Sequence, residues 1–153
     1  MKPDLNAAQP LGVEQAIHGA SWGRMHGGYF SDPQVARPLV EAVRSLAEKC
    51  RPSVIVDLGG GTGFLLSQVK AAVVDKKIAL VNLDCSAEQL AVARTAELVP
   101  VFGSVNEFHR DEVVADRASA LWLMRSVLHY AGEAGLAPLL RHLRRQVRPG
   151  ECW

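Results

Sequence analysis

The chain has 153 residues, of which 48% are hydrophobic and 22% charged, and its formal net charge is +1. This length supports one compact domain, and no apolar run reaches the roughly 18–20 residues of a transmembrane helix. Because the net charge is close to zero, no global field recruits nucleic acid or a membrane surface, so we expect a cytoplasmic protein that binds neither.

The N-terminal stretch is expected to be separate from the main domain, as an arm over residues 1–32 ahead of a domain over 33–153. Residues 11–20 have the composition of a short helix, and a glycine-punctuated loop follows. Trp22, His26 and Tyr29 in this loop are candidates for a lid over a binding site. The alternative is a loop that packs on the edge of the domain.

A helix is predicted from Pro33 to about Cys50, because proline is favoured at the first helical position and Asp32 or Ser31 can cap it. Its expected inward face consists of Val35, Leu39, Val43 and Leu46.

Strands and helices alternate through the rest of the chain. The strands are predicted at Ser53–Leu58, Ile78–Leu83, Val99–Phe102 and Ala118–Met124. The helices are predicted at Phe64–Val74, at Ala87–Ala96 after a Ser86 cap, within Asn106–Val114, and at Gly135–Val147. This order favours a parallel sheet with helices on both faces, and such sheets bind ligands at the carboxyl ends of their strands.

The last predicted helix is amphipathic, and its arginines are interpreted as a solvated face. Its expected inward residues are Leu136, Leu139, Leu140, Leu143 and Val147.

The cysteines give no sign of a metal or redox site. There are three, Cys50, Cys85 and Cys152, at long spacings and without a CxxC pair. We expect unpaired thiols in a reduced compartment and no bound metal.

A glycine loop follows the first predicted strand, which ends near Asp57. Glycines allow a sharp turn, and the amides of a loop that opens a helix can bind a nucleotide-like ligand. A P-loop is excluded because Phe64 and Leu65 stand where lysine and serine or threonine are needed. The dinucleotide fingerprint fits poorly, because its third small position is Phe64.

The remaining pattern is D-x-G-x-G-x-G, satisfied by Asp57, Gly59, Gly61 and Gly63. It resembles the loop of the class I S-adenosylmethionine-dependent methyltransferases, and the resemblance extends over about residues 33–150. It implies that these four residues line the methionine part of the cofactor, where a carboxylate suits the ammonium group. It also implies a Rossmann-like α/β/α sandwich with a mainly parallel sheet of about four strands in the order 3-2-1-4.

Residues at the next strand ends extend the resemblance. Asp84 is expected to bind the ribose hydroxyls, and Cys85 to lie beside the adenosine. Ser104 stands where many relatives have an aspartate for the adenine amino group, and the Val105 amide is expected at the adenine ring. Met124 ends the fourth strand and is expected to border the cofactor.

Methyl transfer from an activated sulfonium needs alignment more than a fixed catalytic residue. His129 is the candidate general base, and its alternative is a capping or packing histidine. Arg125 is either a contact to an acidic substrate or a surface residue. The motifs of nucleic-acid methyltransferases are absent from this region, so the expected acceptor is a small molecule. A non-catalytic methyltransferase-like module is the alternative, and a nicotinamide-dependent oxidoreductase is a distant third.

The printed sequence stops at Trp153, before the last three strands of the family's sheet. The fourth strand is therefore expected at an open edge with uncovered apolar faces. We expect a truncated product, a homodimer or a partner chain that covers this edge.

Overall fold

The computed structural model describes residues 31–73, 75 and 77–153, and all elements below lie in these ranges. The predicted arm, with its short helix and the lid candidates Trp22, His26 and Tyr29, lies outside the described residues apart from Ser31 and Asp32.

The first described helix is α3, Pro33–Cys50, and it begins as predicted. Asp32 caps it, because its Oδ1 accepts a hydrogen bond from the Gln34 amide at 2.8 Å. Of the predicted inward face, Val43 is buried, Leu39 and Leu46 are partly buried against the core, and Val35 is exposed. The buried residues are Ala36, Val40, Val43 and Ala47. The centre of the buried stripe is therefore shifted by one residue from the predicted one, toward Ala36, Val40 and Ala47.

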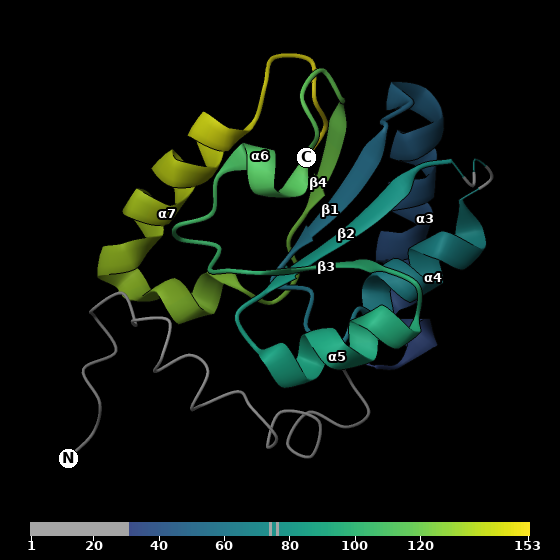
Figure 1. Ribbon diagram of the computed structural model, residues 1–153, viewed down its shortest axis with the longest axis horizontal. Coiled ribbons are helices and arrows are strands. Elements are labelled where there is room, and N and C mark those ends of the chain that lie inside the picture. Colours follow the sequence, from purple (N-terminus) through teal and green to yellow (C-terminus); the bar gives the residue numbers. More distant parts are fainter. Residues whose placement is uncertain (1–30, 74, 76) are drawn as a thin grey trace.

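Four parallel strands form one sheet in the order β3-β2-β1-β4, which confirms the predicted topology (Figure 1). They are β1 Val54–Leu58, β2 Ala79–Asp84, β3 Val99–Phe102 and β4 Ala120–Leu123. Successive strands are connected by the helices α4 Phe64–Ala72, α5 Ala87–Thr95 and α6 Arg110–Val113. The 3₁₀-helix η1 Leu128–Ala131 and helix α7 Gly132–Gln146 follow β4.

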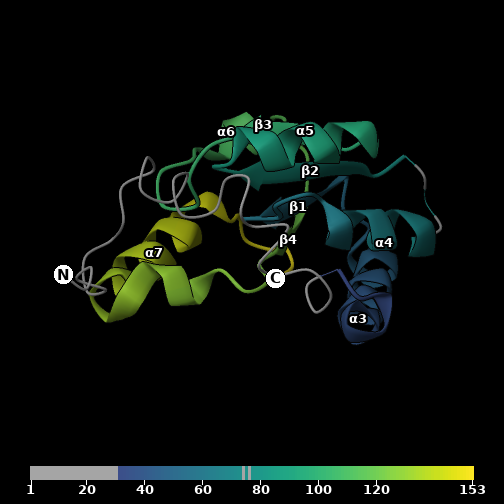
Figure 2. The same cartoon turned by 90° about the horizontal axis from the view of Figure 1, so that it is seen from below.

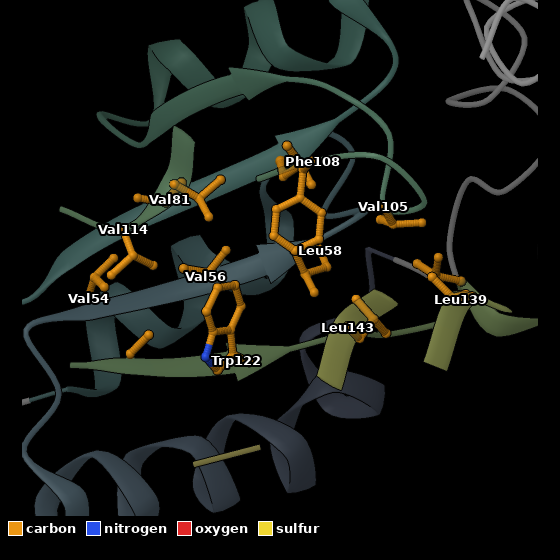
Figure 3. Close-up of a cluster of buried hydrophobic side chains, with 14 of the residues drawn as sticks. Val54, Val56, Leu58, Val81, Val105, Phe108, Val114, Trp122, Leu139 and Leu143 are labelled. Atoms are coloured by element: carbon orange, nitrogen blue, oxygen red, sulfur yellow. The ribbon is translucent and has the colours of Figure 1, made fainter. Parts of the chain in front are cut away.

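Helices cover both faces of the sheet, so the chain is the expected three-layer α/β/α sandwich (Figure 2). Helices α3 and α4 pack on the face that carries Ile55 and Leu121. Helix α7 packs on the opposite face through Leu139 and Leu143, which belong to the same buried cluster as Trp122 (Figure 3).

The predicted inward face of α7 is too wide. Leu139 and Leu143 are buried, but Leu136 and Leu140 are 37% and 49% exposed. Only one narrow stripe of α7, formed by Gly135, Leu139 and Leu143, is buried.

Strand β4 lies at the edge of the sheet, as predicted, but the expectation of uncovered apolar faces is wrong. All four of its residues are buried. Leu121 and Leu123 pack against the α3 and α4 side, and Trp122 packs on the α7 side. The edge itself is partly paired, because Leu121 forms a parallel bridge with Cys152 and the Trp122 amide donates to the Cys152 carbonyl at 3.0 Å.

Glu151 fixes the segment that follows α7. Its buried carboxylate accepts hydrogen bonds from the Arg110 guanidinium at 2.6 and 2.9 Å and from Trp122 Nε1 at 3.0 Å. The amides of Ala120 and Arg148 donate to the same carboxylate at 3.0 and 2.9 Å. Glu151 therefore joins α6, β4 and the end of the described chain.

Cys50 and Cys152 form a disulfide, so the expectation of unpaired thiols is wrong for these two residues. They are 102 residues apart in sequence, and the end of α3 meets the segment beside β4 only in the folded chain. Cys85 takes no part in a disulfide.

No described helix is long and apolar enough to cross a membrane. Among the same residues, no group of three or more histidine, cysteine, aspartate or glutamate side chains is arranged to hold a metal ion.

Candidate functional site

The glycine loop joins the carboxyl end of β1 to the start of α4. Gly59, Gly61 and Gly63 have positive φ angles of 77°, 57° and 76°, a conformation that other residues adopt at a cost. The amides of Gly59 and Gly60 donate to the Leu83 carbonyl at 2.8 and 3.2 Å, which holds the loop against the end of β2.

The space around the loop also requires glycine. A β-carbon at Gly59 would lie 2.6 Å from Val127 Cγ2. One at Gly60 would collide with Asn82 Oδ1 and would lie 2.8 Å from Asp57 Oδ2. Gly60 is outside the D-x-G-x-G-x-G pattern, yet it is constrained as tightly as the glycines within it.

Asp57 lies at the carboxyl end of β1, beneath the loop, and is 2% exposed. The pKa of its carboxyl is raised from 3.8 to about 7, first by burial and then by the charge of Asp84, while Arg125 acts in the opposite direction. No donor in the described part of the chain lies within hydrogen-bond distance of Asp57 Oδ1. A buried carboxylate of this kind is the type of group that a cationic ligand would stabilise.

Asn82 is a site residue that the sequence analysis missed. It is the β2 partner of Asp57 in the strand register and is completely buried. Its Nδ2 donates to the Gly61 carbonyl at 2.8 Å, and its Oδ1 has no donor among the described residues. Its position inside an apolar run hid it, but it stands two residues before Asp84 and therefore on the same face of the strand.

Asp84 connects the end of β2 to the loop. Its Oδ2 accepts from the Gly61 amide at 2.8 Å and its Oδ1 from the Ser86 amide at 2.9 Å. Burial raises the pKa of Asp84 despite the opposing hydrogen bonds from the amides of Ser86, Gly61 and Cys85. Each carboxylate oxygen can accept a second hydrogen bond, so Asp84 keeps the capacity to bind hydroxyl groups.

The other predicted cofactor residues follow the carboxyl ends of their strands. Cys85 follows Asp84 and is partly buried, and Met124 follows β4. Ser104 follows β3, and its hydroxyl accepts a hydrogen bond from the Asn106 amide at 3.2 Å. The Val105 side chain belongs to the core cluster between the sheet and α7. The parallel topology brings all four residues to the edge of the sheet that carries the glycine loop.

His129 is exposed and lies in η1, after β4. Its ring centroid is 3.9 Å from that of Tyr130. Burial and the charge of Asp84 raise the pKa of Tyr130 to about 12, so its hydroxyl stays protonated at neutral pH. The sequence analysis did not assign Tyr130 to the site. The structure places it close enough to Asp84 for their charges to interact.

Beside β4, a groove of about 820 Å³ runs between α3 and α7. Met124 and Leu128 line it at the end nearest the glycine loop, and Pro149 and Trp153 are also among its lining residues.

No family model matches the sequence, and no curated protein matches it. Solved structures do match in fold. DesVI from Streptomyces venezuelae has a TM-score of 0.54 at 18% identity, over 95% of this chain and 58% of its own. A SAM-dependent methyltransferase from Geobacter sulfurreducens, in complex with S-adenosyl-L-homocysteine, has a TM-score of 0.56 at 18% identity, over 95% and 54%.

The O-methyltransferase NcsB1 from neocarzinostatin biosynthesis, in complex with S-adenosylmethionine and 2-hydroxy-5-methyl naphthoic acid, is similar too. Its TM-score is 0.52 at 19% identity, over 97% of this chain and 53% of its own. The described chain therefore has the class I methyltransferase fold, and it spans about half the length of these structures.

Proposed function

We propose that the chain binds S-adenosylmethionine and belongs to a methyltransferase that acts on a small molecule. The observation that carries this proposal is the pair of buried or partly buried carboxylates, Asp57 and Asp84, on either side of a glycine loop that lacks a phosphate-binding lysine. This arrangement suits a ligand with a cationic end and a ribose, without phosphate.

In this proposal, the methionine end of the cofactor lies along the glycine loop, with its ammonium near Asp57. The loop residues involved are Gly59, Gly61 and Gly63. Asp84 accepts hydrogen bonds from the ribose hydroxyls, and the adenosine is bordered by Cys85, Ser104, Val105 and Met124.

The cofactor, when bound, supplies a methyl group already activated on a sulfonium. The chain supplies binding and alignment, since the loop and both strand ends are held by hydrogen bonds before any ligand arrives. His129 stays a candidate base only, because its exposed ring contacts Tyr130. The hydroxyl of Tyr130 is uncharged at neutral pH, and the residue interacts electrostatically with Asp84.

A small-molecule acceptor is supported by the fold neighbours, because NcsB1 was crystallised with a naphthoic acid. The alternative is a methyltransferase-like module without catalysis. It is favoured by Ser104, whose hydroxyl already accepts a local hydrogen bond from Asn106. Methyl transfer by the isolated chain to any acceptor would exclude this alternative.

Calorimetry with S-adenosylmethionine and S-adenosylhomocysteine tests the cofactor. We expect Asp84→Asn to weaken binding by at least about tenfold, because a carboxamide accepts hydroxyl hydrogen bonds less strongly than a carboxylate. Asp116→Asn is the matched control, since the Asp116 side chain is 84% exposed. A folded sample that binds neither ligand at millimolar concentration refutes the proposal.

Two further proposals concern the context of the chain. A second copy or a partner chain covers the groove beside β4, and sedimentation velocity with and without Leu140→Lys tests this. The expected cytoplasmic location is tested by thiol labelling after cell fractionation, because Cys50 and Cys152 would be thiols in a reducing compartment.

A further inference from the structure

Two oxygen atoms beneath the glycine loop are buried without a hydrogen-bond donor from the described residues, Asp57 Oδ1 and Asn82 Oδ1. An unsatisfied buried acceptor costs roughly 1–3 kcal/mol. The two side chains come from paired positions on neighbouring strands and both border Gly60. Their coincidence at one place indicates a shared function.

The orientation of the Asn82 amide is fixed by the loop. Nδ2 donates to the Gly61 carbonyl at 2.8 Å, and a flipped amide would place two acceptor oxygens against each other. With this orientation, Asn82 Oδ1 and Asp57 Oδ2 both border the position of a Gly60 β-carbon, which would collide with the first and lie 2.8 Å from the second.

We propose that Asn82 is a positioning residue of the cofactor site: Nδ2 holds the Gly61 carbonyl, while Oδ1 accepts a hydrogen bond from a proton on Asp57 that leaves when S-adenosylmethionine binds. This inference rests on the proposed function. A protonated carboxyl is a donor, so a proton on Asp57 gives the unpaired Asn82 Oδ1 a hydrogen-bond partner.

The charges around Asp57 agree with a proton held at neutral pH. Burial and the charge of Asp84 on β2 raise the pKa of Asp57, Arg125 after β4 lowers it, and the resulting value is about 7. Tyr130 in η1 interacts electrostatically with Asp84. On the α5 side of the loop, Gly63 meets the uncharged side chains of Ala93 and Leu98.

Ligand binding changes this balance. The ammonium and sulfonium of S-adenosylmethionine are positive, and a positive charge nearby favours the ionised carboxyl. The O–H bond of Asp57 breaks, the electron pair stays on the carboxylate, and the proton passes to solvent. The site then carries a negative charge that pairs with the cationic ligand.

The first test is the pH dependence of S-adenosylmethionine affinity between pH 6 and 8.5. With an Asp57 pKa of about 7, only about a tenth of the site is ionised at pH 6, so we expect a Kd about tenfold weaker there than at pH 8. Calorimetry in two buffers of different ionisation enthalpy should show release of about one proton per site at pH 6. Asp57→Asn is the control, because it retains only the titration of the ligand itself.

Asn82→Leu separates a positioning role from a structural one. Loss of the Oδ1 acceptor destabilises the protonated form of Asp57, so the pH midpoint of binding should move down by on the order of one pH unit. A merely structural Asn82 would weaken affinity equally at every pH and leave the midpoint unchanged, which would overturn the inference.

The second test needs no ligand and no stable Asn82 variant. The infrared difference spectrum between the wild type and Asp57→Asn at pH 6 should contain a protonated-carboxyl band that disappears above pH 8. Absence of this band in the folded protein overturns the shared proton. Absence of binding at every pH, with the band present, overturns the proposed function instead and leaves the protonated Asp57 established.

Discussion

The replacement of Asp57 by asparagine should stabilise the ligand-free protein, although it removes a charge from the candidate site. The carboxyl is protonated up to about pH 7 in the folded chain and up to its ordinary pKa of 3.8 in the unfolded chain. Stability from this group is therefore greatest below pH 3.8, falls as the pH rises to about 7, and is constant above that. Since each pH unit in this window corresponds to about 1.4 kcal/mol, ionised Asp57 costs the fold on the order of 4 kcal/mol at pH 8.

Asp57→Asn removes that cost, because a neutral amide of nearly the same shape occupies the buried position. We expect its gain in the free energy of unfolding to approach about 4 kcal/mol at pH 8 and to shrink to near zero at pH 4. Urea denaturation of the variant and the wild type at a series of pH values measures this difference. Asp116→Asn is the exposed control and should change stability by less than about 1 kcal/mol.

A gain that is the same at pH 4 and pH 8 would refute the argument that burial of the charge is the cause. A loss of stability at pH 8 would show that the Asp57 carboxylate is already well satisfied without ligand. The same variant should bind S-adenosylmethionine more weakly at pH 8, since it lacks the carboxylate. Stability and affinity would then change in opposite directions, which is common where a site is strained for function.

Three other substitutions test the packing around the site. Gly60→Ala should weaken cofactor binding by at least about tenfold and destabilise the fold by about 1–3 kcal/mol, because its β-carbon collides with two buried oxygens. Gly150→Ala is the control: no atom lies within 4 Å of its β-carbon, so cofactor binding should be unchanged. Glu151→Gln should lower the free energy of unfolding, measured by urea denaturation, by about 3–5 kcal/mol. Glu97→Gln, at an exposed ion pair, should lower it by less than about 1 kcal/mol. Equal effects would contradict the assignment of Glu151 as a buried ion-pair partner. Cys152→Ser should have a free energy of unfolding up to about 5 kcal/mol lower than that of the oxidised wild type, and equal to that of the reduced wild type. A difference that persists after reduction would indicate a loss of packing instead.

Glu151 also predicts a dependence on acid. Burial opposes its ionisation, but hydrogen bonds from Arg110, Arg148, Trp122 and Ala120 outweigh this and lower its pKa from the ordinary value of 4.5. Its contribution to stability is therefore present above pH 4.5 and is lost as the pH falls through the lowered pKa. The difference in unfolding free energy between the wild type and Glu151→Gln should shrink in that acid range, and a difference that grows there would contradict the sign.

The topology was predictable because the signals that define it are local. Apolar β-branched runs marked the strands, and the Ser86 cap marked the start of α5, where the Ser86 hydroxyl accepts from the Gln89 amide. Asp57 and Asp84 were identifiable because parallel strands bring their carboxyl ends to one edge.

The errors came from long-range packing, which no local pattern reports. The buried stripe of α3 is shifted by one residue from the predicted one. Asn82 and Tyr130 gained their positions only when β2 and η1 met the loop. The role of Glu151 required Arg110, 41 residues earlier, to fold against it.

The disulfide closes a ring that contains the whole sheet. Because it joins Cys50 to Cys152, every strand and the glycine loop lie on one closed stretch of covalent chain. A single proteolytic cut anywhere in that stretch leaves two fragments still tethered to each other. The oxidised domain can therefore be nicked in a surface loop and stay one molecule, and new termini could be opened there by circular permutation without separating the parts that form the site.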